Sequence, residues 1–192
     1  MSKVRSTVYR WGIALLLAFG GAEGVTAAGH ASALEALNHP GEFKVVKKKV
    51  LPKAQKVLII KSLRKLYLIR NGIPYREYHI ALGKNPVGPK RQEHDQKTPE
   101  GNYTLDFKKS DSAYYRAIHI NYPSRADKVR AKKMGVSPGG AIMIHGQPNW
   151  FGWLSPIRQR FDWTAGCIAV SNGDMDEIWQ AVDPGTAIEI RP

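Results

Sequence analysis

One cysteine and one of the six histidines stand where nucleophilic chemistry would need them. Cys167 begins a short apolar run over residues 167–170, and His145 ends another over 141–144, each beside a glycine. A thiol becomes a nucleophile near neutral pH beside a base or a positive charge, and an imidazole supplies both. Backbone N–H groups around Gly166 and Cys167 would then hold a developing oxyanion. The spacing alone is weak evidence, because six histidines and one cysteine produce such pairs by chance.

Composition restricts the classes of protein that this chain can be. It has 192 residues, 43% of them hydrophobic, with 29 Lys or Arg against 16 Asp or Glu and a net charge of +13. The length suits one domain with a short appendage, and the apolar fraction excludes a disordered chain. One cysteine excludes an internal disulfide framework and a Cys-rich metal site. Nucleic acid is not an expected partner, because no recognition-helix pattern or interleaved aromatic motif is present.

The first 28 residues are typical of an export signal. Lys3, Arg5 and Arg10 precede a short apolar core over 12–21, and small residues at 25–28 fit a cleavage site. The alternative is an uncleaved anchor, but the apolar core is short for a bilayer about 30 Å thick. We therefore predict a periplasmic or cell-envelope protein with no stable membrane span after cleavage. An unpaired cysteine in an exported protein is either buried and inert or kept as a reactive thiol.

Residues 29–56 show weak periodicity and predict a basic linker or lead segment before a domain at 57–192. Positive charge is dense between Lys44 and Lys65, where Glu42 is the one nearby acidic residue. Such a stripe is either a solvated face or a surface for an anionic polymer of the cell envelope. The sequence leaves both readings open.

Short strands dominate the rest of the prediction. Apolar or alternating runs indicate strands at 57–60, 66–69, 75–82, 103–107, 117–121, 141–144, 167–170 and 186–190. Asn71-Gly72 between two of them predicts a tight hairpin. A basic helix is expected at 124–134, a helical turn capped by Ser155, and a helix after Asp174, with Asp174 and Glu177 as a capping box. The sequence therefore predicts a mainly β domain with a few small helices.

The segment 164–172 (TAGCIAVSN), preceded by His145-Gly146, resembles the signature of the YkuD-type L,D-transpeptidase catalytic domain. The signature of that family is His-Gly, an intervening loop, then Ser/Thr-His-Gly-Cys and shortly afterwards an Asn. Segments at 65–68, 71–72, 81–83, 95–101 and 137–140 also fit. The resemblance covers roughly residues 57–191.

The resemblance implies a fold and a chemistry. The fold would be a curved, β-sandwich-like sheet with small helices at its edge. Cys167 would be the nucleophile and His145 the general base, oriented by the backbone carbonyl of Gly146. The amides of Gly166 and Cys167 would line the oxyanion hole. The substrate would be a peptidoglycan stem peptide, cleaved at its L,D bond through a thioester acyl-enzyme and passed to an amine or to water, without metal or cofactor.

Two departures from the signature bear on the reaction. Ala165 stands where the family has a second histidine, and Ala169 where an arginine often follows the cysteine. Both positions are expected to border the substrate cleft. The segment WTAGCIAV, which begins at Trp163, is most similar to the YafK-like branch, in which at least one member is a hydrolase that releases a wall-linked lipoprotein.

Three functions therefore remain open. The first is a transpeptidase, the second is a hydrolase of the same stem peptides or of a wall-linked lipoprotein, and the third is a catalytically silent wall-binding module. Candidate substrate-binding residues are those of the aromatic and basic loop before the cysteine: Trp150, Arg158, Arg160, Trp163 and Thr164. Equally, the tryptophans could serve packing and the arginines a solvated loop.

Overall fold

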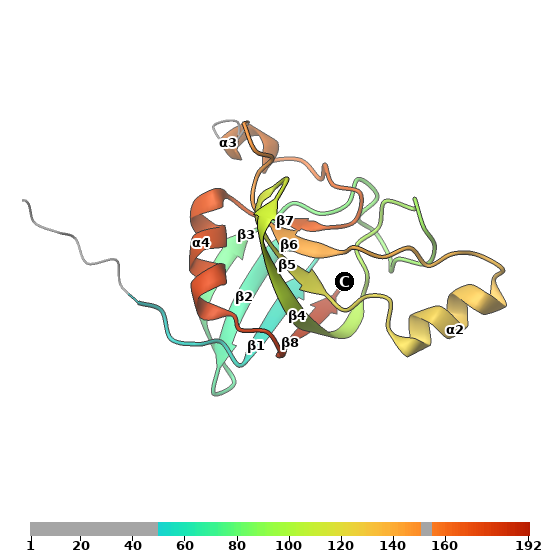
Figure 1. The fold of residues 1–192 in the computed structure, drawn as a ribbon, viewed down its shortest axis with the longest axis horizontal. Helices are drawn as coiled ribbons and strands as arrows, with labels where there is room; N and C mark the ends of the chain where they lie inside the picture. The colour runs from blue at the N-terminus through green and yellow to red at the C-terminus, as the bar shows by residue number, and fades with distance from the viewer. Residues whose placement is uncertain (1–49, 151–154) are drawn as a thin grey trace, which may run out of the picture. The chain divides into compact units, whose positions relative to one another are not determined.

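The computed structural model describes residues 50–150 and 155–192 (Figure 1). The predicted export signal at 1–28 and most of the predicted basic lead segment lie outside the described residues. The described ranges form a mainly β domain in which eight strands make one sheet, in the order β3-β2-β1-β8-β4-β5-β6-β7. In these ranges no helix is both long and apolar enough to cross a membrane. The predicted fold class, mainly β with a few small helices, is confirmed.

The strands are short, with the exception of β4. Their bounds are β1 Lys56–Ile60, β2 Lys65–Arg70, β3 Ile73–His79, β4 Gly101–Ser112, β5 Tyr115–Ile120, β6 Met143–His145, β7 Ile168–Ala169 and β8 Thr186–Arg191. The described helices are α2 Arg125–Lys133, α3 Ser155–Arg158 and α4 Asn172–Ala181. The predicted strand at 103–107 is thus the first part of a 12-residue strand.

Alternation of apolar residues explains the position of the core. In β1 and β2, Val57, Ile59, Leu66 and Leu68 are fully buried while their neighbours are not, as expected for strands with one buried face. β2 and β3 are joined by Asn71 and Gly72, with φ values of 51° and 76°. Positive φ at both residues matches the tight hairpin that the sequence predicts.

The sheet curls because its two ends are joined. The predicted strand at 75–82 is wrong in its second half: β3 ends at His79, and the chain then pairs with a different partner. Ala81 and Ala169 exchange backbone hydrogen bonds of 2.9 and 2.8 Å, although β3 and β7 are opposite ends of the strand order. Residues 80–83 therefore bring the β3 end of the sheet against β7, beside Cys167.

The two longer helices begin at capping residues. Ser124 caps α2, accepting the backbone N–H of Asp127 at 3.2 Å. The predicted capping box at Asp174 and Glu177 is wrong, because α4 begins earlier: Ser171 is the cap and accepts the N–H of Asp174 at 3.1 Å. Asp174 thus lies in the first turn, where a carboxylate stabilises the positive end of the helix dipole. The early start places the N-terminus of α4 directly after β7.

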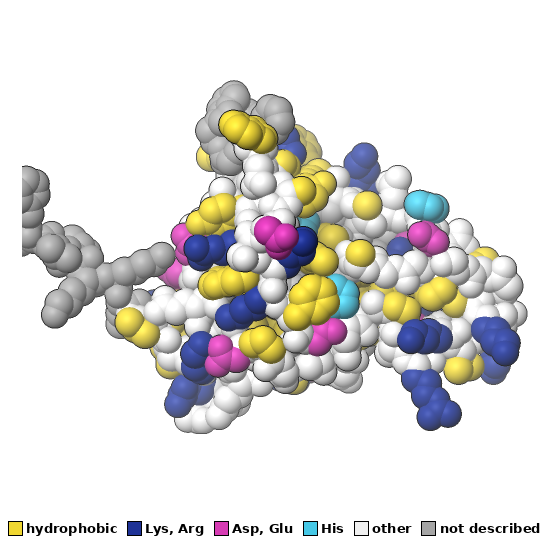
Figure 2. All heavy atoms as spheres, viewed as in Figure 1, with side chains coloured by type: hydrophobic (Ala, Val, Ile, Leu, Met, Phe, Trp, Pro, Cys, Tyr) yellow, Lys and Arg dark blue, Asp and Glu magenta, His cyan; other side chains and the backbone are white. Residues whose placement is uncertain are grey.

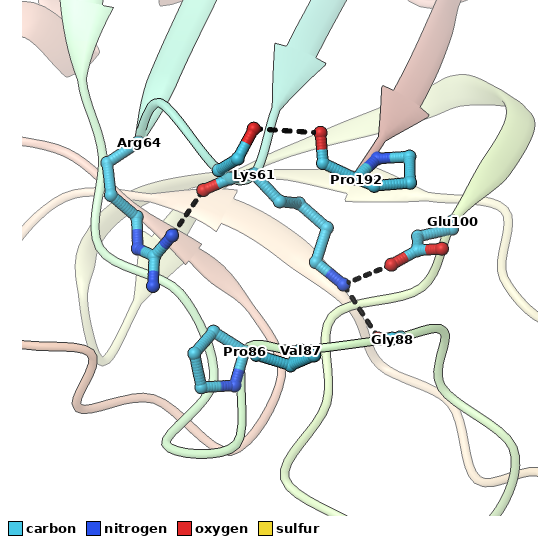
Figure 3. Close-up of a pocket in the computed structure, with 8 residues that line it drawn as sticks. Lys61, Arg64, Pro86, Val87, Gly88, Glu100 and Pro192 are labelled. Carbon is cyan, nitrogen blue, oxygen red and sulfur yellow. Dashed lines mark hydrogen bonds and ion pairs between the residues drawn. The ribbon is translucent and has the colours of Figure 1, made fainter.

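Lys61 fixes the loop between β3 and β4. It is 2% exposed, and its Nζ donates to the carbonyl oxygens of Gly88 and Thr98 at 2.8 and 3.2 Å and to Glu100 at 2.7 Å. Figure 3 shows Lys61 reaching from the end of β1 toward Gly88 and Glu100, at one side of a pocket of about 160 Å³. This buried ion pair holds both ends of the segment 88–100.

The described part of the predicted basic stripe is neutralised within the domain. Its members form ion pairs with distant acidic residues: Lys53–Asp183 at 2.6 Å, Lys56–Glu189, Lys61–Glu100 at 2.7 Å, Arg64–Asp162 at 2.7 Å and Lys65–Glu77 at 2.8 Å. The remaining members, from Lys44 to Lys49, lie outside the described residues. From Lys53 onward, the basic residues of the stripe therefore form intramolecular ion pairs, and they do not make an uncompensated positive surface for a partner.

Candidate active site

The register of β6 and β7 brings Cys167 and His145 to one face of the sheet. The two strands are parallel, with Ile144 beside Ile168 and His145 beside Ala169. Side chains two residues apart on a strand share a face, so Cys167, two residues before Ala169, faces the same side as His145. Ile144 and Ile168 face the core and are fully buried. The predicted base thus lies at the end of β6, and the predicted nucleophile lies directly before the adjacent β7.

Both side chains line a pocket of about 170 Å³. Its other lining residues come from the β4–β5 hairpin, β5, the first residue of β6 and the segment before it, and the loop before β7: Ser112, Tyr114, Ala117, Ala141, Met143, Trp163, Thr164 and Ala165. None of them lines the pocket beside Lys61. The reactive residues therefore have a cleft of their own, which is mostly apolar.

His145 is held in one tautomer. It is 4% exposed, and its Nδ1 lies 2.7 Å from the carbonyl oxygen of Gly146. A carbonyl oxygen can only accept, so Nδ1 carries the hydrogen and Nε2 keeps its lone pair when the ring is neutral. Burial lowers the pKa of His145 to about 4, although the Gly146 hydrogen bond opposes this shift. At neutral pH His145 is therefore an uncharged base.

Cys167 rests as a neutral thiol. Its Sγ lies 3.5 Å from the carbonyl oxygen of Ala141, to which the thiol donates. Burial raises the pKa of Cys167, while a backbone hydrogen bond from Met143 and the charge of Lys90 oppose the rise. A raised thiol pKa beside a lowered imidazole pKa means that the proton stays on sulfur in the resting state. The pair is thus suited to general-base catalysis rather than to a preformed ion pair.

Thr164 organises the turn that carries the cysteine. Its hydroxyl donates to the carbonyl of Cys167 at 2.7 Å and accepts the N–H of Gly166 at 3.1 Å. Gly166 has a φ of +129°, and a Cβ there would lie 2.6 Å from the carbonyl oxygen of Lys97. Only glycine fits this position. The amide of Gly166, expected in the oxyanion hole, is therefore engaged by Thr164, and the amide of Cys167 is the stronger candidate donor.

Asn172 supports the segment behind His145. Its Oδ1 accepts the backbone N–H of Gln147 at 2.8 Å. A Cβ on Gly146 would lie 2.7 Å from the same oxygen, so glycine is needed for this close approach. The family signature contains this asparagine, but no local sequence pattern explains its role. The structure shows that it positions the His-Gly turn.

An aromatic wall stands over the histidine. The ring centroids of Tyr114 and His145 are 4.6 Å apart, and those of His145 and Trp163 are 5.7 Å apart. Arg158 lies over Trp163, with its guanidinium carbon 5.1 Å from the ring centre. Sequence reasoning missed Tyr114, which lies at the tip of the β4–β5 hairpin. No local pattern distinguishes it, because its place in the pocket depends on contacts 31 and 49 residues away in sequence.

The other predicted substrate-binding residues divide into two groups. Trp163 and Thr164 line the pocket. Arg160 is exposed and lines a separate polar hollow, and Trp150 is 92% exposed and outside the pocket lining. The structure therefore does not bring Arg160 or Trp150 to Cys167.

The two departures from the family signature also differ in position. Ala165 is exposed and lines the pocket, as expected. Ala169 does not border the cleft, and that prediction is wrong: it is fully buried and paired with Ala81 through the bridge that closes the sheet. The closure of the sheet thus keeps residue 169 out of the pocket. Of the two departures from the family signature, only Ala165 changes a side chain that lines the pocket.

Comparison with known proteins agrees with this geometry. Residues 54–190 match the YkuD family, described as the L,D-transpeptidase catalytic domain. YafK of Escherichia coli K12 is provisionally named an L,D-transpeptidase. This chain and YafK are 32% identical over 132 residues, and the alignment covers 66% of this chain and 46% of YafK.

Two solved structures are also similar. Pgp2 of Campylobacter jejuni, a helical cell shape determining protein, has a TM-score of 0.54 and 30% identity over 70% of this chain and 46% of Pgp2. Bd1075 of Bdellovibrio bacteriovorus has a TM-score of 0.50 and 26% identity over 72% of this chain and 48% of Bd1075. The chain therefore spans about half the length of these relatives. Members of the YkuD family act on peptidoglycan stem peptides in the cell envelope. Because the match covers most of the chain, we conclude that this chain belongs to the YkuD family of L,D-transpeptidase catalytic domains.

Proposed function

We propose that this chain is a cysteine-dependent L,D-transpeptidase that acts on peptidoglycan stem peptides through a thioester acyl-enzyme. The observation that carries the proposal is the shared face of β6 and β7. There a half-buried thiol and a neutral imidazole with its Nδ1 bound to Gly146 line one pocket. A silent wall-binding module is disfavoured, because such a module has no chemical need for this pair.

The mechanism follows from the protonation states. His145 takes the Cys167 proton as the sulfur attacks the carbonyl carbon at the L-to-D junction. The amide of Cys167 stabilises the oxyanion, and the imidazolium then gives its proton to the departing amine. A thioester remains on Cys167. His145 next removes a proton from the incoming amine, whose nitrogen attacks the thioester and releases the thiol.

Hydrolysis is the second candidate, and Ala165 is the observation that favours it. A methyl group lines the pocket where the family signature has an imidazole, and this side chain is exposed. Water therefore has room beside the thioester. With water as the acceptor, the same pair would make a carboxypeptidase or an amidase that releases a wall-linked lipoprotein.

Exposed positive charge supports a location at the wall. Arg125, Lys128, Lys132 and Lys133 lie on the exposed side of α2 and form no ion pair with the described residues, and Figure 2 shows lysine and arginine side chains gathered over this helix. Stem peptides carry carboxylates, which such a face attracts. We propose that the chain is exported through residues 1–28 and works in the periplasm or cell envelope. The description of Pgp2 as a helical cell shape determining protein supports a function in wall remodelling.

The deciding experiment is mass spectrometry of muropeptides after the protein is incubated with purified sacculi. The matched control is Cys167→Ala, with its fold checked by thermal unfolding. New links between stem peptides, or exchanged terminal residues, are expected for a transpeptidase. Shortened stems or released lipoprotein remnants would instead establish the hydrolase. Identical products from the two proteins would overturn the enzymatic proposal.

A further inference from the structure

The imidazole of His145 packs against an aromatic ring from the tip of the β4–β5 hairpin. His145 is 4% exposed, whereas Tyr114 is 39% exposed, and the centroids of the two rings are 4.6 Å apart. Both side chains line the pocket that holds Cys167. The Tyr114 hydroxyl forms no hydrogen bond with the described residues. Because the more exposed ring packs on the buried one, removal of the Tyr114 side chain would open the imidazole to water.

Asn149 holds the tip of this hairpin with three hydrogen bonds. Its side-chain oxygen accepts the backbone N–H of Tyr115 at 2.9 Å, and its side-chain nitrogen donates to the carbonyl oxygen of Ser112 at 2.9 Å. Its backbone N–H donates to the carbonyl oxygen of Ala113 at 3.0 Å. The three bonds enclose Tyr114 on both sides in sequence, so they fix the backbone that carries its ring.

The proposed base and the ring that covers it are therefore fixed to one segment. The Nδ1 of His145 is bound to the carbonyl oxygen of Gly146 at 2.7 Å, and the same stretch of chain continues to Asn149. Within the tip, the hydroxyl of Ser112 accepts the backbone N–H of Tyr114 at 3.0 Å. The segment that orients the imidazole thus also sets the position of the hairpin over it.

We infer that Asn149 and Tyr114 are positioning residues for the base, in which Asn149 holds the hairpin tip so that the Tyr114 ring excludes water from His145. The inference rests on the proposed function, since it takes His145 as the general base. An imidazole removed from water disfavours its charged form. Burial accordingly lowers the pKa of His145 to about 4. The Tyr114 ring supplies part of that burial and so keeps the base neutral in acidic solution.

Charge does not account for the neutral imidazole. The titratable side chains that line the pocket with His145 are those of Tyr114 and Cys167. Charged side chains on neighbouring segments lie outside this lining and contact other groups: Lys90 with Asp95, Lys109 with Asp111, Arg116 with Asp176, and Arg158 over Trp163. The pKa of His145 is lowered by burial, and the hydrogen bond with Gly146 opposes the shift. Removal of the covering ring should therefore have a direct effect on the protonation of the base.

The test follows the titration of the His145 ring by NMR in protein with ¹³C-labelled histidines. Its signal is the one missing from His145→Gln. Tyr114→Ala should raise the pKa of His145 from about 4 toward 6.5, by about 1 or more. Tyr114→Phe keeps the ring and should leave the titration unchanged. Phe107→Ala is the matched control, because Phe107 of β4 stacks on a different histidine, His119, with ring centroids 4.5 Å apart.

Asn149→Ala tests whether the hairpin tip must be held. This change removes both side-chain hydrogen bonds and keeps the backbone bond to Ala113. It should raise the pKa of His145 in the same direction, but by less than Tyr114→Ala does. The double variant should match Tyr114→Ala alone, because Asn149 acts through the ring and neighbouring sites are not additive. Thermal unfolding checks the fold of each variant.

Turnover of stem peptides supplies a second measurement. The pH dependence of kcat/KM reports the pKa of the base in the free enzyme. His145 accepts a proton only when it is neutral, so activity is lost as the pH falls through its pKa. In Tyr114→Ala this loss should begin at a higher pH than in the wild type, by the same interval as in the NMR titration.

The outcomes separate this inference from the proposed function. An unchanged His145 titration in Tyr114→Ala, or an equal change in Tyr114→Phe or Phe107→Ala, would overturn the covering role of the ring. Effects of Tyr114→Ala and Asn149→Ala that add in the double variant would overturn the role of Asn149. Absence of turnover in the wild type would count against the proposed function, while the NMR titration would still decide whether the ring covers the imidazole.

Discussion

The side-chain oxygen of Asn172 accepts the backbone N–H of Gln147 at 2.8 Å, and so ties the start of α4 to the turn that follows His145. Gly146, whose carbonyl orients the imidazole, packs against the same oxygen. A helix N-terminus thus fixes the orientation of the proposed base, although the two segments are 25 residues apart in sequence.

Replacement of Asn172 should therefore affect both stability and reactivity. Asn172→Ala leaves the N–H of Gln147 without its acceptor, which should cost about 1–3 kcal/mol in the free energy of unfolding. It should also slow turnover of stem peptides, because the Gly146 carbonyl loses its support. Asn172→Asp keeps an acceptor oxygen and should retain most of the activity. Denaturant unfolding and turnover rates measure the two effects, and equal behaviour of both variants would contradict this positioning role.

The pH dependence of alkylation should reveal a neutral resting pair. Because burial raises the pKa of Cys167 and lowers that of His145 to about 4, little thiolate exists at neutral pH. The iodoacetamide rate should rise by about tenfold per pH unit between pH 7 and the thiol pKa, as the thiolate fraction does. His145→Ala, which lacks the base, should react more slowly near pH 7. A plateau in the wild type that begins below pH 7 would demonstrate a preformed ion pair and contradict this assignment.

The buried Lys61–Glu100 pair should matter more than an exposed pair on the same sheet. Lys61→Met leaves Glu100 without its cation in a site where Lys61 is 2% exposed, and should destabilise the fold by about 3 kcal/mol or more. Lys65→Met is the control, because the Lys65–Glu77 pair is largely exposed and should contribute little. Urea unfolding of the two variants provides the comparison. Equal losses would show that the loop between β3 and β4 does not depend on Lys61.

Replacing Ala165 and Ala169 by the residues of the family signature should change the stability of the fold to different extents. Ala169→Arg places a guanidinium in a fully buried position and should destabilise the fold by more than about 3 kcal/mol. Ala165→His places an imidazole on an exposed position of the pocket lining and should change stability by less than about 0.5 kcal/mol. It should also shift products toward transfer if the open space admits water. A stable Ala169→Arg protein would contradict the enclosed position of that residue.

Local sequence determined the secondary structure and the chemical identity of the candidate site. Alternating apolar residues define β1 and β2, and Asn71-Gly72 defines the hairpin, because these patterns act over a few neighbouring residues. The signature around Cys167 and the His145-Gly146 pair gave the family, which the comparison confirms. Boundaries were less secure: the start of α4 was misplaced by three residues, since Ser171 and Asp174 are both acceptable caps in sequence.

Tertiary structure alone decided which residues share the pocket. Tyr114 reaches His145 because the β4–β5 hairpin folds over the end of β6, and Ala169 leaves the cleft because residues 80–83 close the sheet against β7. The pairing of β1 with β8, which are far apart in sequence, places Lys56 beside Glu189, 133 residues away. A sequence pattern records spacing along one strand or helix, whereas these contacts depend on the order and curvature of the whole sheet. For this reason the candidate nucleophile and base could be predicted from the sequence, whereas the shape and charge of the cleft could not.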